Sequence, residues 1–189
     1  SLDYEQTLVN VARLVVQNLA DWSVVDVMDE ERRFSRLKVA SADPDQAALC
    51  AVLEQMPPDR DLPHFVQSVS ESGRPILVEQ VTSEWVESFA QTPEHLQAVM
   101  GTGVISLIAV PLAMRGQPLG VLMFGSSTRS RVFGHGDLHL AEALADRAAV
   151  AIENARLYRS SVRATQLQQV LAEAGAMLAA SLDYQQTLA

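Results

Sequence analysis

The stretch from Asp137 to Ala180 constrains the fold most, because it keeps a helical pattern of apolar residues and contains no proline. At about 1.5 Å per residue, its roughly 43 residues extend about 65 Å as a helix. A globular domain of comparable length is only about 40 Å across. We therefore expect this helix to begin inside a domain and to continue beyond it.

The two halves of this predicted helix require different partners. Residues 138–157 are rich in alanine and can pack closely on a sheet. The second half carries apolar residues at close to heptad spacing, the pattern of a coiled coil. We expect this stripe to pair with a second copy of the chain, so that the terminal helices hold a homodimer. The residues predicted to carry the dimer and signalling contacts are Leu157, Leu167, Leu171 and Leu178.

An eight-residue segment at the start of the chain is repeated near its end. Residues 1–8 read SLDYEQTL and residues 181–188 read SLDYQQTL. In both copies an aspartate stands three residues before a glutamine, the capping-box signature of a helix start. The spacing indicates a domain-sized unit that begins again, with a chance similarity of two helix starts as the alternative. The predicted divisions are a domain over 1–160, a linker helix over 161–180 and the start of a second unit over 181–189.

The composition is typical of a soluble domain that binds no nucleic acid. Hydrophobic residues make up 48% of the chain and charged residues 20%, which excludes a disordered tail. The net charge of −9 argues against nucleic-acid binding, because lysine and arginine supply much of that affinity. The longest apolar run, Val104–Met114, is well short of the ~20 residues of a membrane-spanning helix. No export signal is visible and the single cysteine, Cys50, suits a reducing compartment, so we expect a cytoplasmic protein.

The segments before the long helix alternate between strand and helix signals. Two hairpins are predicted, one over residues 22–29 and 34–41 and one over 104–114 and 119–127, around the turn RGQP. The strand 104–114 is apolar on both faces, so we expect it at the centre of the sheet, with a local distortion at Pro111. The other predicted elements are helices over 2–20, 43–55, 64–72 and 83–100, the last broken near Pro93, and a strand over 75–80.

The C-terminal half of the chain strongly resembles the GAF domain. The resemblance is carried first by S-x-x-x-V-P-L from Ser106 to Leu112 and by G-V-L over Gly120–Leu122. These are followed by F-x-x-x-D-L from Phe133 to Leu138 and by A-x-A-I-E-N-A-x-L-Y from Ala149 to Tyr158. The likeness covers about residues 2–160 and is less specific in the middle of the chain.

The resemblance implies an α+β fold in α/β/α layers, built on a central antiparallel sheet of five to six strands. The N- and C-terminal helices would pack together on one face of this sheet. The segment 43–103 would cover the other face and form a small-molecule pocket. The implied function is a sensory input domain of a multidomain bacterial signalling protein, such as a sensor histidine kinase. The C-terminal helix would transmit ligand binding to a dimer partner and to neighbouring domains of the same chain; the alternative is a structural dimerisation and spacer module without a ligand.

No cofactor and no enzyme activity are predicted from the motifs present. Bilin attachment in GAF-like proteins needs a pocket cysteine, whereas Cys50 is flanked by leucine and alanine and is predicted to pack in the core. Sulfoxide reduction needs two thiols and this chain has one, so that activity is not expected. The N-K-F-x-D-E stretch of cyclic-nucleotide-binding members is not present, and no motif supports heme. His135 and His139 have metal-ligand spacing, but solvated histidines around an N-cap Asp137 are the favoured interpretation.

Six residues are candidates for the wall of the implied pocket. Asp26 is an acid in the middle of an apolar strand, so it either faces a ligand or pairs across the hairpin with Arg36 or Lys38, which is the favoured alternative. The other five lie in the covering segment, where each is an ordinary core residue in the alternative interpretation. They are Phe65, Trp85, Phe89, His95 and Met100.

Overall fold

The computed structural model describes residues 2–29 and 31–187. In the terminal helices, the side chains of residues 2–7, 14 and 17 and of a number of positions from 155 onward are not described. Leu167, Leu171 and Leu178 are among these positions, so the contacts predicted for their side chains lie outside the described residues.

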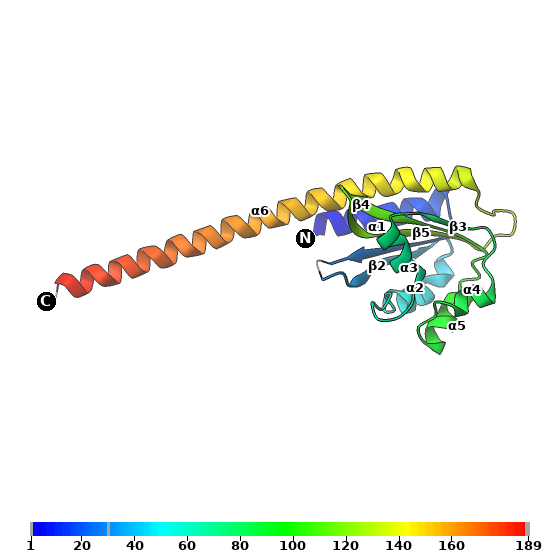
Figure 1. Ribbon diagram of the computed structural model, residues 1–189, viewed down its shortest axis with the longest axis horizontal. Coiled ribbons are helices and arrows are strands. Elements are labelled where there is room, and N and C mark those ends of the chain that lie inside the picture. Colours follow the sequence, from blue (N-terminus) through cyan, green and yellow to red (C-terminus); the bar gives the residue numbers. More distant parts are fainter. Residues whose placement is uncertain (1, 30, 188–189) are drawn as a thin grey trace.

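A five-stranded antiparallel sheet forms the centre of the molecule (Figure 1). Its strands, in the order β2-β1-β5-β4-β3, are β1 (Trp22–Met28), β2 (Phe34–Ser41), β3 (Ile76–Val78), β4 (Ser106–Met114) and β5 (Gln117–Ser126). The two predicted hairpins are therefore β1–β2 and β4–β5. The sequence predicts β4 at the centre of the sheet, but the central strand is β5. The reason is that β1 pairs with the side of β5 that β4 leaves free.

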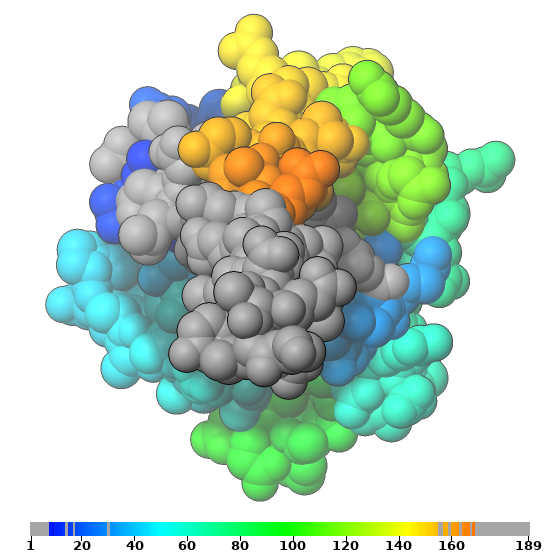
Figure 2. Space-filling model, turned by 90° about the vertical axis from the view of Figure 1, so that its left-hand side faces the viewer, coloured from blue at the N-terminus to red at the C-terminus, as the bar shows by residue number. Residues whose placement is uncertain are grey.

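Helices cover both faces of the sheet, as the fold class predicts. One face carries α1 (Leu2–Asn18) and α6 (His135–Thr187), which lie side by side (Figure 1). The other face carries the segment between the hairpins, and Figure 2 shows its green residues on the side of the molecule opposite the yellow residues of α6. This segment contains a 3-10 turn (Pro44–Gln46), α2 (Ala47–Glu54), α3 (Phe65–Ser72), α4 (Ser83–Glu87) and α5 (Pro93–Gly101).

Polar caps and one glycine set the limits of the covering helices. The side chain of Asp43 accepts from the N–H of Asp45, and the hydroxyls of Thr82 and Thr92 cap α4 and α5. Gly73 ends α3 with a φ of 63°, a left-handed conformation that glycine adopts without strain. These caps and Gly73 divide the covering segment into short helices.

Alternation along the strands separates two cores. Ile108 of β4 and Leu122 of β5 pack beneath α1 and α6. Their chain neighbours Ala109 and Met123 lie in the core on the opposite face, together with Val66 and Val69 of α3. Because successive side chains of a strand point to opposite faces, β4 and β5 contact both helical layers at once.

Pro111 lies where the sheet can accommodate it. The pairing of β3 with β4 ends at Ala109, so β4 has no further neighbour on that side at Pro111. The irregularity in the β4–β5 ladder falls between Leu112 and Ala113, one residue beyond the predicted position. A proline without an N–H is tolerated at such a place because no ladder bond is lost.

The C-terminal helix α6 is 53 residues long, which corresponds to about 80 Å. It begins at His135, so Asp137 is not its N-cap: the carboxylate lies in the first turn and accepts from the N–H of Gly134 at 2.9 Å. Its first part packs on β4 and its remainder extends away from the sheet (Figure 1). The helix continues through residues 181–187, so the second copy of the octet begins no new helix here.

Within the residues that the structure describes, no helix combines the length and the apolar character needed to cross a membrane.

Candidate ligand pocket

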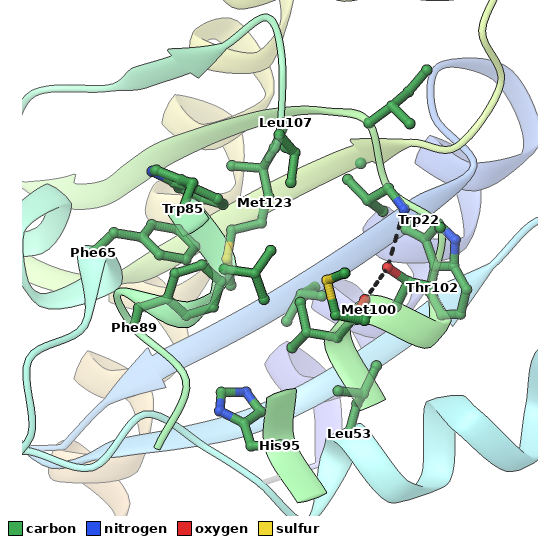
Figure 3. A pocket seen from close by; sticks show the side chains of 18 of the residues that line it. Trp22, Leu53, Phe65, Trp85, Phe89, His95, Met100, Thr102, Leu107 and Met123 are labelled. Atoms are coloured by element: carbon green, nitrogen blue, oxygen red, sulfur yellow. Dashed lines mark hydrogen bonds between the residues drawn. The ribbon is translucent and has the colours of Figure 1, made fainter. Parts of the chain in front are cut away.

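A cavity of about 250 Å³ lies between the sheet and the segment that contains α4 and α5 (Figure 3). The sheet contributes Trp22 and Val24 of β1, Leu107 of β4 and Met123 of β5. These residues line it because they occupy the strand positions that point away from α1 and α6. The cavity is therefore the space left between the sheet and the short helices that cover it.

Three aromatic rings form one side of the cavity. Phe65 of α3, Trp85 of α4 and Phe89, which follows α4, have ring centroids 4.8–5.0 Å apart. Tilted and edge-to-face contacts at this distance stabilise an aromatic cluster beyond the area it buries. The cluster joins α3 to α4 and the residue that follows its C-cap, and so forms a continuous aromatic wall.

The opposite side of the cavity is formed by Trp22 and by the turn that leads from α5 into β4 (Figure 3). Thr102 fixes this turn: its hydroxyl donates to the carbonyl of Val99 at 2.6 Å and accepts from the N–H of Val104 at 3.3 Å. Met100 lines the cavity but is 47% exposed, which locates it at the edge of the site.

A buried ion pair lies at the polar end of the cavity. Arg36 donates to both carboxylate oxygens of Asp26, from Nε at 2.8 Å and from Nη2 at 3.1 Å. Its Nη1 donates to the carbonyl of Leu53 at 3.3 Å. Arg36 contributes to the cavity wall, whereas Asp26 lies behind it and does not.

Two histidines stand beside Arg36 in the wall. Their rings are stacked, with centroids 6.1 Å apart. Nδ1 of His64 accepts from the N–H of Val66, and Nδ1 of His95 accepts from the N–H of Gln91, both at 3.2 Å. Burial, followed by the nearby charge of Arg36 and by the coulombic interaction with the ring of His95, lowers the pKa of His64 to about 3. Burial and the charge of Arg36 also lower the pKa of His95, so both rings are neutral at neutral pH.

The structure places five of the six predicted pocket residues in the wall of one cavity: Phe65, Trp85, Phe89, His95 and Met100. The sixth, Asp26, forms the predicted cross-hairpin pair with Arg36. Sequence reasoning did not include Trp22, His64, Leu107 and Met123. Trp22 shares the strand face of Asp26, so alternation along β1 was a signal for it, whereas nothing in the local sequence marks Met123.

Residues considered for cofactor chemistry lie outside this cavity. Cys50 is buried beside Leu53 and Val39, and burial raises the pKa of its thiol. His139 is exposed, with Nδ1 3.2 Å from Oε2 of Glu142. In the described part of the chain, no three His, Cys, Asp or Glu side chains are close enough together to hold a metal ion.

Comparison with known proteins agrees with this architecture. The sequence model of the GAF domain matches residues 3–152. No significant match was found among the curated proteins.

Several solved structures share the fold at low sequence identity. The GAF domain/HD domain protein from Geobacter sulfurreducens has a TM-score of 0.64 at 18% identity, over 82% of this chain and 95% of that one. The GAF domain of a phosphoenolpyruvate-protein phosphotransferase from Coxiella burnetii has a TM-score of 0.64 at 18% identity, over 85% and 88%. A domain of a putative two-component sensor histidine kinase from Sinorhizobium meliloti has a TM-score of 0.57 at 17% identity, over 83% and 95%.

Proposed function

Because the chain belongs to the GAF domain family, we propose that it is a sensory input domain of a multidomain bacterial signalling protein. It binds a small molecule in the cavity and transmits the change through α6 to a dimer partner and an output domain. The similar solved domains include one from a protein described as a sensor histidine kinase, which supports this assignment.

The observation that carries the proposal is the double role of β4 and β5. Leu107 and Met123 line the cavity, while their chain neighbours Ile108 and Leu122 belong to the core beneath α6 and do not line it. The two layers are thus separated by the thickness of one strand. A ligand that displaces the cavity side of β4 therefore also displaces the surface on which α6 rests.

Ser106 gives the two layers a second connection. Its buried hydroxyl donates to the carbonyl of Val78 in β3 and accepts from the N–H of Phe133, both at 3.1 Å. Phe133 lies two residues before α6 and is buried in the core beneath it. Movement of β3 or of the start of β4 is therefore coupled to the segment that enters α6.

The exposed surface of α6 supports a dimer. Val150 and Leu157 are 47% and 55% exposed and stand seven residues apart. The same seven-residue series continues in the sequence to Ala164, Leu171 and Leu178. A heptad series of apolar residues favours pairing with another helix.

The presence of a cavity favours ligand binding over the alternative of a spacer without a ligand. In a spacer with a collapsed pocket, the aromatic side chains would fill the space, whereas here they line a volume of about 250 Å³. A concave cavity lined mostly by apolar and aromatic side chains, with a few polar groups, is the usual form of a small-molecule site.

A thermal-shift screen of purines, hemes, bilins and small aromatic compounds tests the proposal. At least one compound should raise the melting temperature of the wild type by mass action. Leu107→Trp fills the cavity from β4 and should abolish this rise, whereas Val132→Trp, at a site that is 52% exposed, should leave it unchanged. A screen without any response, or an equal response of the Leu107 variant, would contradict binding in the cavity.

Transmission is tested with the compound that the screen identifies. Tyr158→Cys introduces a thiol on the exposed surface of α6, and Cys50→Ala removes the native one. The rate of disulfide formation between two copies should change when the compound is added. An identical rate with and without the bound compound would contradict transmission through α6.

A further inference from the structure

The polar end of the cavity indicates the chemistry of the ligand, an inference that rests on the proposed function. Nδ1 of His64 and Nδ1 of His95 each accept a backbone N–H, so the proton of each neutral ring resides on Nε2. In the described chain, neither Nε2 has a protein partner, and the buried side-chain atoms without a partner are limited to the hydroxyls of Ser23 and Ser70. Both Nε2–H groups are therefore accessible, in the cavity that both rings line.

Arg36 adds further donors and no acceptor at this end. A guanidinium carries five N–H groups, of which three are engaged with Asp26 and Leu53. Both oxygens of Asp26 accept from Arg36, and Asp26 does not reach the cavity. The side chains of Arg36, His64 and His95 therefore offer a ligand only hydrogen-bond donors.

This group of donors carries no net charge. Asp26 neutralises Arg36, and both histidines are kept neutral by burial and by the charge of Arg36. A carboxylate at this end would lose its hydration without gaining an unpaired positive charge, which is costly. A neutral oxygen acceptor such as a carbonyl satisfies the donors without that cost.

The rest of the wall fits the flat body of an aromatic molecule. Phe65, Trp85 and Phe89 cover one side, and Trp22 with Met100 covers the other (Figure 3). An apolar cavity of about 150 Å³ is large enough to bind benzene. The cavity of about 250 Å³ therefore has room for a ring with a substituent.

We infer that the cavity takes an uncharged aromatic compound whose carbonyl oxygen accepts a hydrogen bond from Nε2–H of His64 or His95. The aromatic walls hold the ring, and the donors of Arg36, His64 and His95 select the acceptor. A purely apolar ring leaves these donors unpaired. The ammonium group of a protonated benzylic amine has no acceptor, so its N–H groups would face the N–H groups of the protein.

Four probes of similar size test this inference on the wild-type protein: acetophenone, isopropylbenzene, benzoate and benzylamine. In a purely apolar cavity isopropylbenzene would bind more tightly than acetophenone, because a buried carbonyl without a partner is unfavourable. Donors at the polar end should reverse that order. Acetophenone should then bind about fivefold more tightly than isopropylbenzene, because it gains one net hydrogen bond. Dissociation constants at pH 7.5 are measured by isothermal titration or by ligand-observed NMR.

The outcomes separate the ligand class from the proposed function. If isopropylbenzene, benzoate or benzylamine binds more tightly than acetophenone, the inferred ligand class is wrong and ligand binding by the domain stands. If neither these probes nor any compound of the wider screen binds, both the inference and the proposed function fail.

Two variants locate the donor. His64→Phe and His95→Phe keep a flat ring and remove Nε2–H, and at least one of them should reduce the preference for acetophenone over isopropylbenzene about threefold or more. His139→Phe, on the exposed surface of α6, should keep the wild-type preference. An unchanged preference in both cavity variants would overturn the assignment, and the comparison of probes on the wild type does not depend on how these variants fold.

Discussion

Arg36 donates to both carboxylate oxygens of Asp26 in a region where the two side chains are only 6% and 0% exposed. The pair joins β1 to β2 directly beside the register shift between Val25 and Asp26. Each charge is buried only because the other is present, since an isolated buried charge is strongly unfavourable. The pair therefore holds the irregular part of the hairpin together and gives the cavity a polar end without net charge.

Arg36→Met should lower the free energy of unfolding by about 3–5 kcal/mol, because it leaves the carboxylate of Asp26 buried and unpaired. The double variant Asp26→Leu with Arg36→Met should recover much of this loss, since no charge then remains buried. Urea denaturation at pH 7.5 measures both values. A double variant as unstable as the single one would show that the geometry of the pair, and not the unpaired charge, determines the cost.

Lys38→Met is the matched control on the same strand. Lys38 donates to Glu54 at 2.6 Å, but both side chains are partly exposed, at 31% and 26%. An ion pair in contact with water contributes about 0–1 kcal/mol. A loss as large as that of Arg36→Met would contradict the role of burial.

Stability should fall in acid because of His64. Its pKa is about 3 in the folded chain, against about 6.5 when unfolded, so the unfolded state binds more protons between these values. The contribution of neutral His64 to the free energy of unfolding is fully present above about pH 6.5. It is lost as the pH falls toward 3, at up to about 1.4 kcal/mol per pH unit. Urea denaturation at pH 7, 6, 5 and 4.5 measures the slope.

His64→Asn should reduce this slope while it keeps α3 capped. The side chain of Asn can accept from the N–H of Val66 in place of Nδ1, because asparagine is a favourable N-cap residue. His139→Asn removes an exposed imidazole and should leave the slope at the wild-type value. If the His64 variant has the wild-type slope, other groups cause the loss of stability in acid.

The sequence predicts those parts of the fold that depend on local patterns. Alternation places Trp22, Val24 and Asp26 on one face of β1, and the helical pattern after Phe133 gives an extended helix that begins within two residues of the predicted start. The pair of Asp26 with Arg36 also follows from local reasoning, because hairpin register brings these two residues together. Such features require only neighbours along the chain.

Features that depend on distant contacts could not be predicted in this way. The central position of β5 arises from its pairing with β1, almost one hundred residues earlier in the chain. His64 joins the polar end only because the covering segment folds back over β2, and no local pattern specifies that path. The sequence also does not predict that α6 continues beyond Ala180, because the octet has the signature of a helix start although the helix continues through it.

Gly120→Ala should destabilise the sheet by about 1–3 kcal/mol or more, as for other overpacked sites. A Cβ at this position would overlap the backbone oxygen of Asp26 on the neighbouring strand, and backbone cannot rotate away as a side chain can. Thermal and urea unfolding measure the loss. Gly134→Ala is the control, because nothing lies within 4 Å of its Cβ position, and it should stay within about 0.5 kcal/mol of wild type.

Leu157→Asp should weaken the proposed dimer at least about tenfold, because it introduces a charge into a heptad position that is 55% exposed in the single chain. Gln166→Asp is the control: it introduces the same charge nine residues further along α6, about two and a half turns away and so on the opposite side of the helix. Sedimentation equilibrium measures self-association, and the melting temperature of the globular part should be equal in both variants. A wild type that sediments as a monomer, or equal dissociation constants for the two variants, would contradict pairing through this face of α6.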